Sequence, residues 1–207
     1  MAIEEGKMDI YIQLKKYTDY SLGLSNEKSK LFYEDTSLNN IIFTNYDLNN
    51  SSFLEVNFIE CDFSQVYMSG ASLCGSTFEE CIFKDNVYKK GNSDHAIFKN
   101  SNFEGIDAFR TSFYECTFSE LTIIDSDMRN CSFSDATFSN VIFKNVNFDS
   151  SSFNSSVFKN VKFIDCSFEK LRFNDAIGIE SVDFENTNII IDGETKRYLG
   201  NEIKNYF

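Results

Sequence analysis

Residues 131–175 read CSFSD ATFSN VIFKN VNFDS SSFNS SVFKN VKFID CSFEK LRFND when they are written in fives. The third residue of every group is phenylalanine, from Phe133 to Phe173, and the first residue is small in every group except the last. A period of five matches neither the 3.6-residue turn of a helix nor the two-residue repeat of a strand. A chain that turns a corner every five residues would place all of these phenylalanines on its inner side.

The same frame extends backwards to Phe43 without a slip. We call the third residue of each group the centre. From Phe43 to Phe173, only Ser93 and Ala108 are centres without a large apolar side chain. Four groups would form one square coil of ~20 residues, and successive coils would stack by backbone hydrogen bonds at the ~4.8 Å spacing of neighbouring strands. Fixed-period self-similarity of this kind indicates a solenoid.

This pattern resembles the pentapeptide-repeat family, whose units are summarised as A(D/N)LXX. The resemblance runs from about residue 36 to residue 178. It implies an all-β fold, a right-handed quadrilateral β-helix. Phenylalanine dominates the centre here where many members favour leucine, and Ser, Cys and Val share the small position with Ala. Neither departure conflicts with the fold.

Residues 20 apart should then stack in the core. The predicted ladders consist of Phe43, Phe63, Phe83, Phe103, Phe143 and Phe163, and of Phe58, Phe78, Phe98, Phe118, Phe138 and Phe158. Five cysteines occupy the small inward position, and only Cys61 and Cys81 are 20 apart. Their expected separation permits a disulfide, but a pair of buried thiols is the preferred interpretation. Cys74 follows a centre and should face outward.

The two ends lack the period, which divides the chain into a 1–35 cap, a 36–180 β-helix and a 181–207 terminal segment. Within the cap, residues 9–14 alternate as a strand would, and residues 25–33 have the composition of a short helix. After the frame breaks near Gly178, we expect a short C-terminal helix with Leu199, Ile203, Tyr206 and Phe207 on one side. This helix would either fold back as a cap or form a homodimer.

The formal net charge is -13, which argues against direct binding of nucleic acid, because phosphates require basic stripes. Acids gather in the last position of the repeats. Sorted by face, one side carries Glu60, Glu80 and Glu120, and another carries Glu55, Glu115, Asp135 and Asp175. Acidic flanks of this kind either imitate the charge of DNA or serve only solubility.

Two features of the repeat surface invite a functional interpretation. Phe109 and Tyr114 face outward and form a candidate contact patch. The sole histidine, His95, lies in the weak unit GNSDH, and residues 89–95 should bulge from the coil. Histidine is a common general base, but no nucleophile accompanies His95, so a solvated loop residue is the preferred interpretation.

Quinolone-resistance proteins of the Qnr type, and related immunity proteins, are acidic pentapeptide-repeat rods that dimerise through C-terminal segments. The resemblance to them implies a DNA mimic that binds DNA gyrase or topoisomerase IV. Many of them carry two loops that interrupt the repeats, whereas only residues 89–95 could form a loop here. The alternative is an adaptor that presents flat faces to another protein.

Enzymatic, metal and membrane functions are not predicted. The sequence has no glycine-rich phosphate loop, no nucleophile with a matching base and no cluster of metal ligands, so we expect no catalytic residue and no cofactor. It also has no signal-like apolar segment at its start and no apolar run of the ~20 residues that span a bilayer. A cytoplasmic protein with reduced thiols is the expectation.

Overall fold

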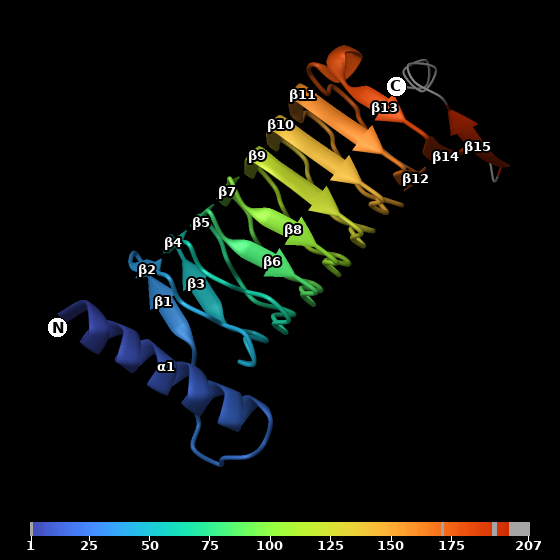
Figure 1. Ribbon diagram of the computed structural model, residues 1–207. Helices are drawn as coiled ribbons and strands as arrows, with labels where there is room; N and C mark the ends of the chain where they lie inside the picture. The colour runs from blue at the N-terminus through green and yellow to red at the C-terminus, as the bar shows by residue number, and fades with distance from the viewer. Residues whose placement is uncertain (1, 171, 192–193, 199–207) are drawn as a thin grey trace.

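A computed structural model of the chain shows a straight rod of stacked square coils (Figure 1). The structure describes residues 2–170, 172–191 and 194–198. One helix, α1 (Ala2–Ser21), precedes the rod, and a 3₁₀ turn, η1 (Ile179–Ser181), lies near its far end. The strands are β1 (Phe32–Glu34), β2 (Ser37–Asn39), β3 (Ser52–Leu54), β4 (Asn57–Ile59), β5 (Thr77–Glu79), β6 (Ile82–Lys84), β7 (Ile97–Lys99), β8 (Asn102–Glu104), β9 (Thr117–Ile124), β10 (Thr137–Lys144), β11 (Val157–Ile164), β12 (Ser167–Glu169), β13 (Asp183–Glu185), β14 (Thr187–Ile191) and β15 (Glu194–Tyr198).

The register of the sheets confirms the square solenoid that the five-residue period predicts. Phe58 pairs with Phe78, Phe78 with Phe98, and Phe98 with Phe118, each across a parallel pair and each 20 residues apart. Isolated bridges such as Ser72 to Asn92 keep the same register outside the named strands. Pairing begins at β1, before the boundary at residue 36 that the sequence suggests, because Phe32 already pairs with Ser52.

We number the four faces of the rod in chain order. Face I carries the centres from Tyr33 to Phe173 in steps of 20, and face II carries those from Leu38 to Phe158. Face III carries the centres from Phe43 to Phe163, and face IV those from Leu48 to Phe168. Consecutive faces adjoin in a square, so face II lies opposite face IV.

The corners explain why the period is five. The last residue of almost every unit has a positive φ, for example 55° at Glu80, 54° at Glu120 and 57° at Asn140. This left-handed conformation turns the chain, and Asn, Asp and Gly adopt it most readily. Gly70, Gly75 and Gly105 fill three corners with φ between 67° and 69°. The side chains at the corners point outward, so each corner column forms a straight row along the rod.

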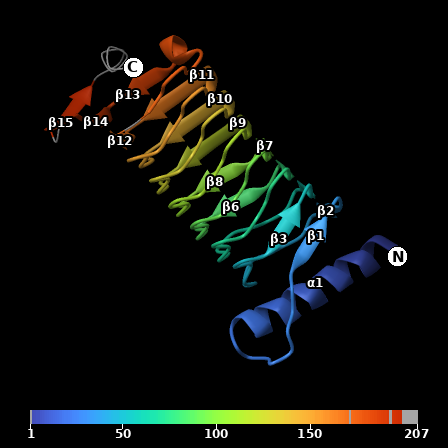
Figure 2. The same ribbon diagram turned by 180° about the vertical axis from the view of Figure 1, so that it is seen from behind.

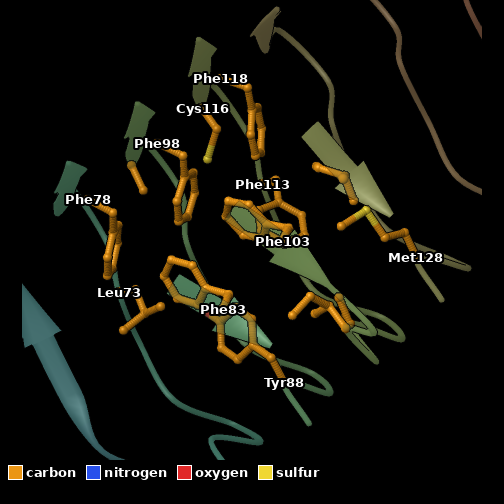
Figure 3. Packing of buried hydrophobic residues seen from close by; sticks show 14 of the residues in the cluster. Leu73, Phe78, Phe83, Tyr88, Phe98, Phe103, Phe113, Cys116, Phe118 and Met128 are labelled. Atoms are coloured by element: carbon orange, nitrogen blue, oxygen red, sulfur yellow. The ribbon is translucent and has the colours of Figure 1, made fainter. Parts of the chain in front are cut away.

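The core consists of the centres and of the small first residues. All twelve phenylalanines of the two predicted ladders are buried. Their rings stack between coils, with centroids 4.5 Å apart for Phe43 and Phe63 and 5.3 Å apart for Phe138 and Phe158. Rings of neighbouring faces meet edge to face, as for Phe58 and Phe63. Figure 3 shows this packing around Phe98. Such contacts add ~0.5–1.5 kcal/mol to simple burial.

The N-terminal segment differs from both sequence-based expectations. Residues 9–14 belong to α1 rather than to a strand, because Ile10, Leu14 and Tyr17 follow the helical spacing and are buried against the first coil. Residues 25–31 contain no helix, and β1 already begins at Phe32. Figures 1 and 2 show α1 lying across the N-terminal end of the rod.

The C-terminal end also differs in part from the structure that the sequence predicts. The 3₁₀ turn η1 adds one residue to the coil, so Phe184 pairs with Phe163 across 21 positions, and their rings still stack at 5.3 Å. Glu194–Tyr198, expected to lead into a helix, is strand β15, which pairs antiparallel with β14. In this hairpin β15 forms backbone hydrogen bonds with the edge of β14, which would otherwise be open to pairing with another chain. Leu199, Ile203, Tyr206 and Phe207 lie outside the described residues.

Candidate binding surfaces

Two acidic corner rows border face II. Row I/II, between faces I and II, carries Glu55, Glu115, Asp135 and Asp175. Row II/III carries Glu60, Glu80 and Glu120, and Glu180 follows in η1. The seven acids at these corners have positive φ, for instance 53° at Glu55 and 59° at Asp135. The left-handed corners therefore hold the carboxylates in two straight lines on either side of one flat face.

Few cations interrupt these rows. Across the middle of face II, Lys99 donates to Glu79 at 2.8 Å. In row I/II, His95 Nδ1 lies 3.1 Å from Glu115, and its φ of 62° places it at a corner. In row II/III, the side-chain amide of Asn140 donates to Glu120, and Asn160 donates to Asn140 at 2.7 Å. Amide donors leave the charge of Glu120 in place, so face II keeps its negative edges.

Residues 89–95 do not bulge from the rod, contrary to the prediction from the weak unit. Lys90 N donates to Phe109 O at 3.0 Å, and Ser93 N donates to Ser112 O at 2.9 Å, as in any other coil. The small centre at Ser93 has another cause. The buried Tyr88 hydroxyl lies 2.8 Å from Ser93 Oγ, so the tyrosine fills the space that a large centre would occupy. His95 is therefore a corner residue and not a loop residue.

The structure separates the two residues of the predicted contact patch. Phe109 lies on face IV, half-buried, with the guanidinium carbons of Arg110 and Arg129 5.1 and 5.6 Å from its ring centroid. Tyr114 lies on face I, where its ring meets His95 edge to face. A hydrogen bond to Glu115 raises the pKa of the Tyr114 hydroxyl to about 12. The two aromatic side chains thus belong to different surfaces.

The cysteines occupy the positions that the frame assigns to them. Cys61, Cys81, Cys116, Cys131 and Cys166 are buried, Cys74 is partly exposed, and all six are free thiols. Within residues 2–170, 172–191 and 194–198, no three His, Cys, Asp or Glu side chains gather as a metal site requires. In the same part of the chain, no helix combines the length and apolarity needed to cross a membrane.

Comparison with known families gives the same assignment as the geometry. A model described as the pentapeptide repeat region matches residues 96–173, and a second, described as pentapeptide repeats, matches residues 34–65 and 57–85. The chain belongs to the pentapeptide-repeat family. Among curated proteins, no sequence matched this pentapeptide-repeat chain.

Several solved structures are similar to this chain. Full-length QnrB1, a plasmid-mediated fluoroquinolone resistance protein, is 15% identical, with 77% of this chain and 93% of that one covered and a TM-score of 0.33. A pentapeptide repeat protein from the Arabidopsis thaliana thylakoid lumen is 21% identical, with 53% and 66% covered and a TM-score of 0.37. HetL from the cyanobacterium Nostoc sp. strain PCC 7120, involved in heterocyst differentiation regulation, is 11% identical, with 86% and 96% covered and a TM-score of 0.27.

Proposed function

We propose that this pentapeptide-repeat protein is a non-enzymatic binding protein whose face II imitates the charge of DNA. The supporting observation is the pair of parallel carboxylate rows that the left-handed corners hold along face II. Glu55 and Asp135 are four coils apart, about 19 Å along the rod at the strand spacing. Six row carboxylates fall within that length, roughly one for every 3 Å, against one charge per ~1.7 Å of duplex DNA. The line charge is therefore about half that of DNA.

A basic DNA-binding groove is the surface that such a face would fit. DNA gyrase and topoisomerase IV are the candidate partners, a choice that comes from the sequence resemblance to Qnr-type members of the family. Face II is flat and the core behind it is filled with stacked phenylalanine rings, which favours binding over catalysis, since a small-molecule substrate needs a concave site. Homodimerisation through the C-terminal segment, residues 181–207, stays a prediction.

The test is a gyrase supercoiling assay with the purified protein, with and without a fluoroquinolone. We expect inhibition of supercoiling in the absence of drug, relieved as salt rises, because exposed charges are screened at high ionic strength. Supercoiling restored in the presence of drug would establish target protection. If the protein has no effect with or without drug, even at concentrations well above that of the enzyme, gyrase is excluded as the partner. That result would favour the adaptor alternative.

A matched pair of variants tests the face itself. The triple variant Glu60→Gln, Glu80→Gln, Glu120→Gln removes three charges from row II/III and should weaken inhibition. The control variant Asp85→Asn, Asp125→Asn, Asp165→Asn removes three charges from the corner row between faces III and IV. Equal effects of the two variants would show that net charge, and not face II, determines binding.

A further inference from the structure

Face IV, opposite the acidic face II, carries cations and aromatic rings side by side. Four cations lie on three successive coils of this face and its corner with face I, namely Lys89, Lys90, Arg110 and Arg129. Phe109 lies among them, and Tyr67, which is 61% exposed, lies on the preceding coil beside Lys89. We call these six residues the cationic–aromatic stripe. In a chain of net charge -13, this concentration of cations needs an explanation.

Ion pairs within the stripe account for only half of its charge. Lys89 Nζ lies 2.7 Å from Asp107, and Arg129 lies 2.6 Å from Asp127, so these two cations are neutralised. Lys90 and Arg110 form no ion pair among the described residues, and both side chains are exposed. Arg110 instead stacks on Phe109, with 5.1 Å from its guanidinium carbon to the ring centroid. Two cations without an ion pair, with the Phe109 ring beside one of them, remain available to a partner.

The spacing within the stripe selects the shape of that partner. Lys90 and Arg110 occupy the same corner row on adjacent coils, ~4.8 Å apart along the rod. Residues i and i+4 of an α-helix lie on the same face ≈5–6 Å apart, whereas same-side residues of an extended strand are ~6.8 Å apart. Tyr67 and Phe109 are about two coils apart, ~10 Å, which is close to two helical turns. A helix lying along the rod therefore matches both pairs.

We propose that face IV is a second docking surface, whose partner is an acidic amphipathic helix with carboxylates one turn apart. The carboxylates would meet Lys90 and Arg110, and apolar side chains on the flank of the helix would contact Phe109 and Tyr67. A surface hollow of about 660 Å³ adjoins the stripe, walled by Tyr67, Lys89, Lys90 and by Ser21 at the end of α1, and it gives room for a bulky side chain. A nucleic acid fits less well, because the opposite corner row of face IV carries Asp85, Asp125 and Asp165, whose carboxylates repel phosphates.

The experiment is fluorescence anisotropy with a labelled alanine-based helical peptide of about 20 residues, which carries Glu at i, i+4 and i+8 and Leu beside them. The control peptide has Gln in place of each Glu. We expect the acidic peptide to bind at low salt, and Lys90→Glu or Arg110→Glu to weaken it by roughly threefold to tenfold. Phe109→Ala should weaken it as well. Thermal unfolding of each variant checks that the rod is intact.

Lys170→Glu is the matched control, because Lys170 lies in the same corner row three coils beyond Arg110 and should leave binding unchanged. The triple Gln variant of face II should also leave it unchanged, so this test succeeds or fails independently of the proposed DNA mimicry. Equal binding of the Gln peptide, absence of binding by the Glu peptide, or equal weakening by Lys170→Glu would overturn the proposal. Tighter binding of a 20-nucleotide single strand than of the peptide would also overturn it, in favour of a nucleic-acid ligand.

Discussion

The hydroxyl of Tyr88 lies 2.8 Å from Oγ of Ser93 inside the rod, five residues along the same coil. Tyr88 is the centre of its unit on face IV, and its ring extends toward face I. A Cβ on Gly91 would lie 2.0 Å from Cε2 of this ring. The repeat is broken at three positions of this coil, by Tyr88, Gly91 and Ser93. The three departures are linked, because the large Tyr88 side chain fills the space that the small residues at 91 and 93 leave free.

Gly91→Ala should therefore destabilise the protein, although alanine is the residue that the repeat favours at this position. Overpacking a filled core costs about 1–3 kcal/mol, and the thermal midpoint should fall accordingly. The double variant Gly91→Ala, Tyr88→Leu should recover part of the loss, because leucine vacates the space beside residue 91. A Gly91→Ala protein as stable as the parent would mean that the Tyr88 ring moves aside freely.

The five-residue period was sufficient to predict the coils, their register and the buried ladders, because each of these depends only on which residue falls at which step. It could not predict the exchange between Tyr88 and Gly91, which depends on the volumes of side chains from two different faces. The N-terminal helix was missed for a related reason. Ile10, Leu14 and Tyr17 form a narrow apolar stripe, and the partner that makes it stable is the open end of the first coil.

The stability of the protein at alkaline pH should depend on the buried hydroxyl of Tyr88. Burial raises the pKa of its hydroxyl well above the ordinary value of 10.0. A raised pKa in the folded state contributes stability that is fully present below pH ~10, where the unfolded tyrosine titrates, and is lost as pH rises above it. Tyr88→Phe should move the alkaline unfolding midpoint upward, measured by circular dichroism. Tyr67→Phe is the control at an exposed position, and an equal shift in both variants would contradict this role for Tyr88.

The stacked ladders predict at which positions the shortening of a side chain to alanine destabilises the rod most. Phe138 stacks on Phe118 at 5.1 Å and on Phe158 at 5.3 Å, and its side chain is fully buried. Phe138→Ala should cost about 3–5 kcal/mol of unfolding free energy, measured by chemical denaturation. Phe32→Ala, at a position that is 52% exposed, should cost less than about 1 kcal/mol. Similar losses at both positions would show that ring stacking contributes little.

The number of thiols that react in the native protein should show how many cysteines face inward. Burial raises the pKa of Cys131 and of Cys166 to about 12, so neither forms much thiolate at pH 8. Only Cys74 is partly exposed among the six. A thiol reagent should titrate one cysteine in the native protein and six after unfolding in guanidinium chloride. Cys74→Ser should bring the native count to zero, and a remaining fast-reacting thiol would show that a coil opens.

The helix α1 closes the exposed backbone at the N-terminal end of the rod. The Ile42 amide donates to the Tyr11 hydroxyl at 3.0 Å, and the Asp47 amide donates to Thr18 Oγ1 at 3.0 Å. The Tyr17 hydroxyl donates to the Asn49 carbonyl. In the middle of the rod, the preceding coil would satisfy the groups that these side chains satisfy here. An uncovered strand edge is a template for pairing with another chain, so α1 should keep the rod from associating end to end.

Leu14→Arg tests this role, because Leu14 is fully buried between α1 and the first coil. A buried arginine without a partner should release the helix, while the remaining coils stay folded, since a solenoid is stabilised mainly by contacts between neighbouring repeats. The expected result is concentration-dependent self-association in size-exclusion chromatography with light scattering. Ile12→Arg is the matched control on the same helix, at a position that is 47% exposed, and it should behave as the parent does. Self-association of neither variant would mean that α1 is not what prevents end-to-end pairing.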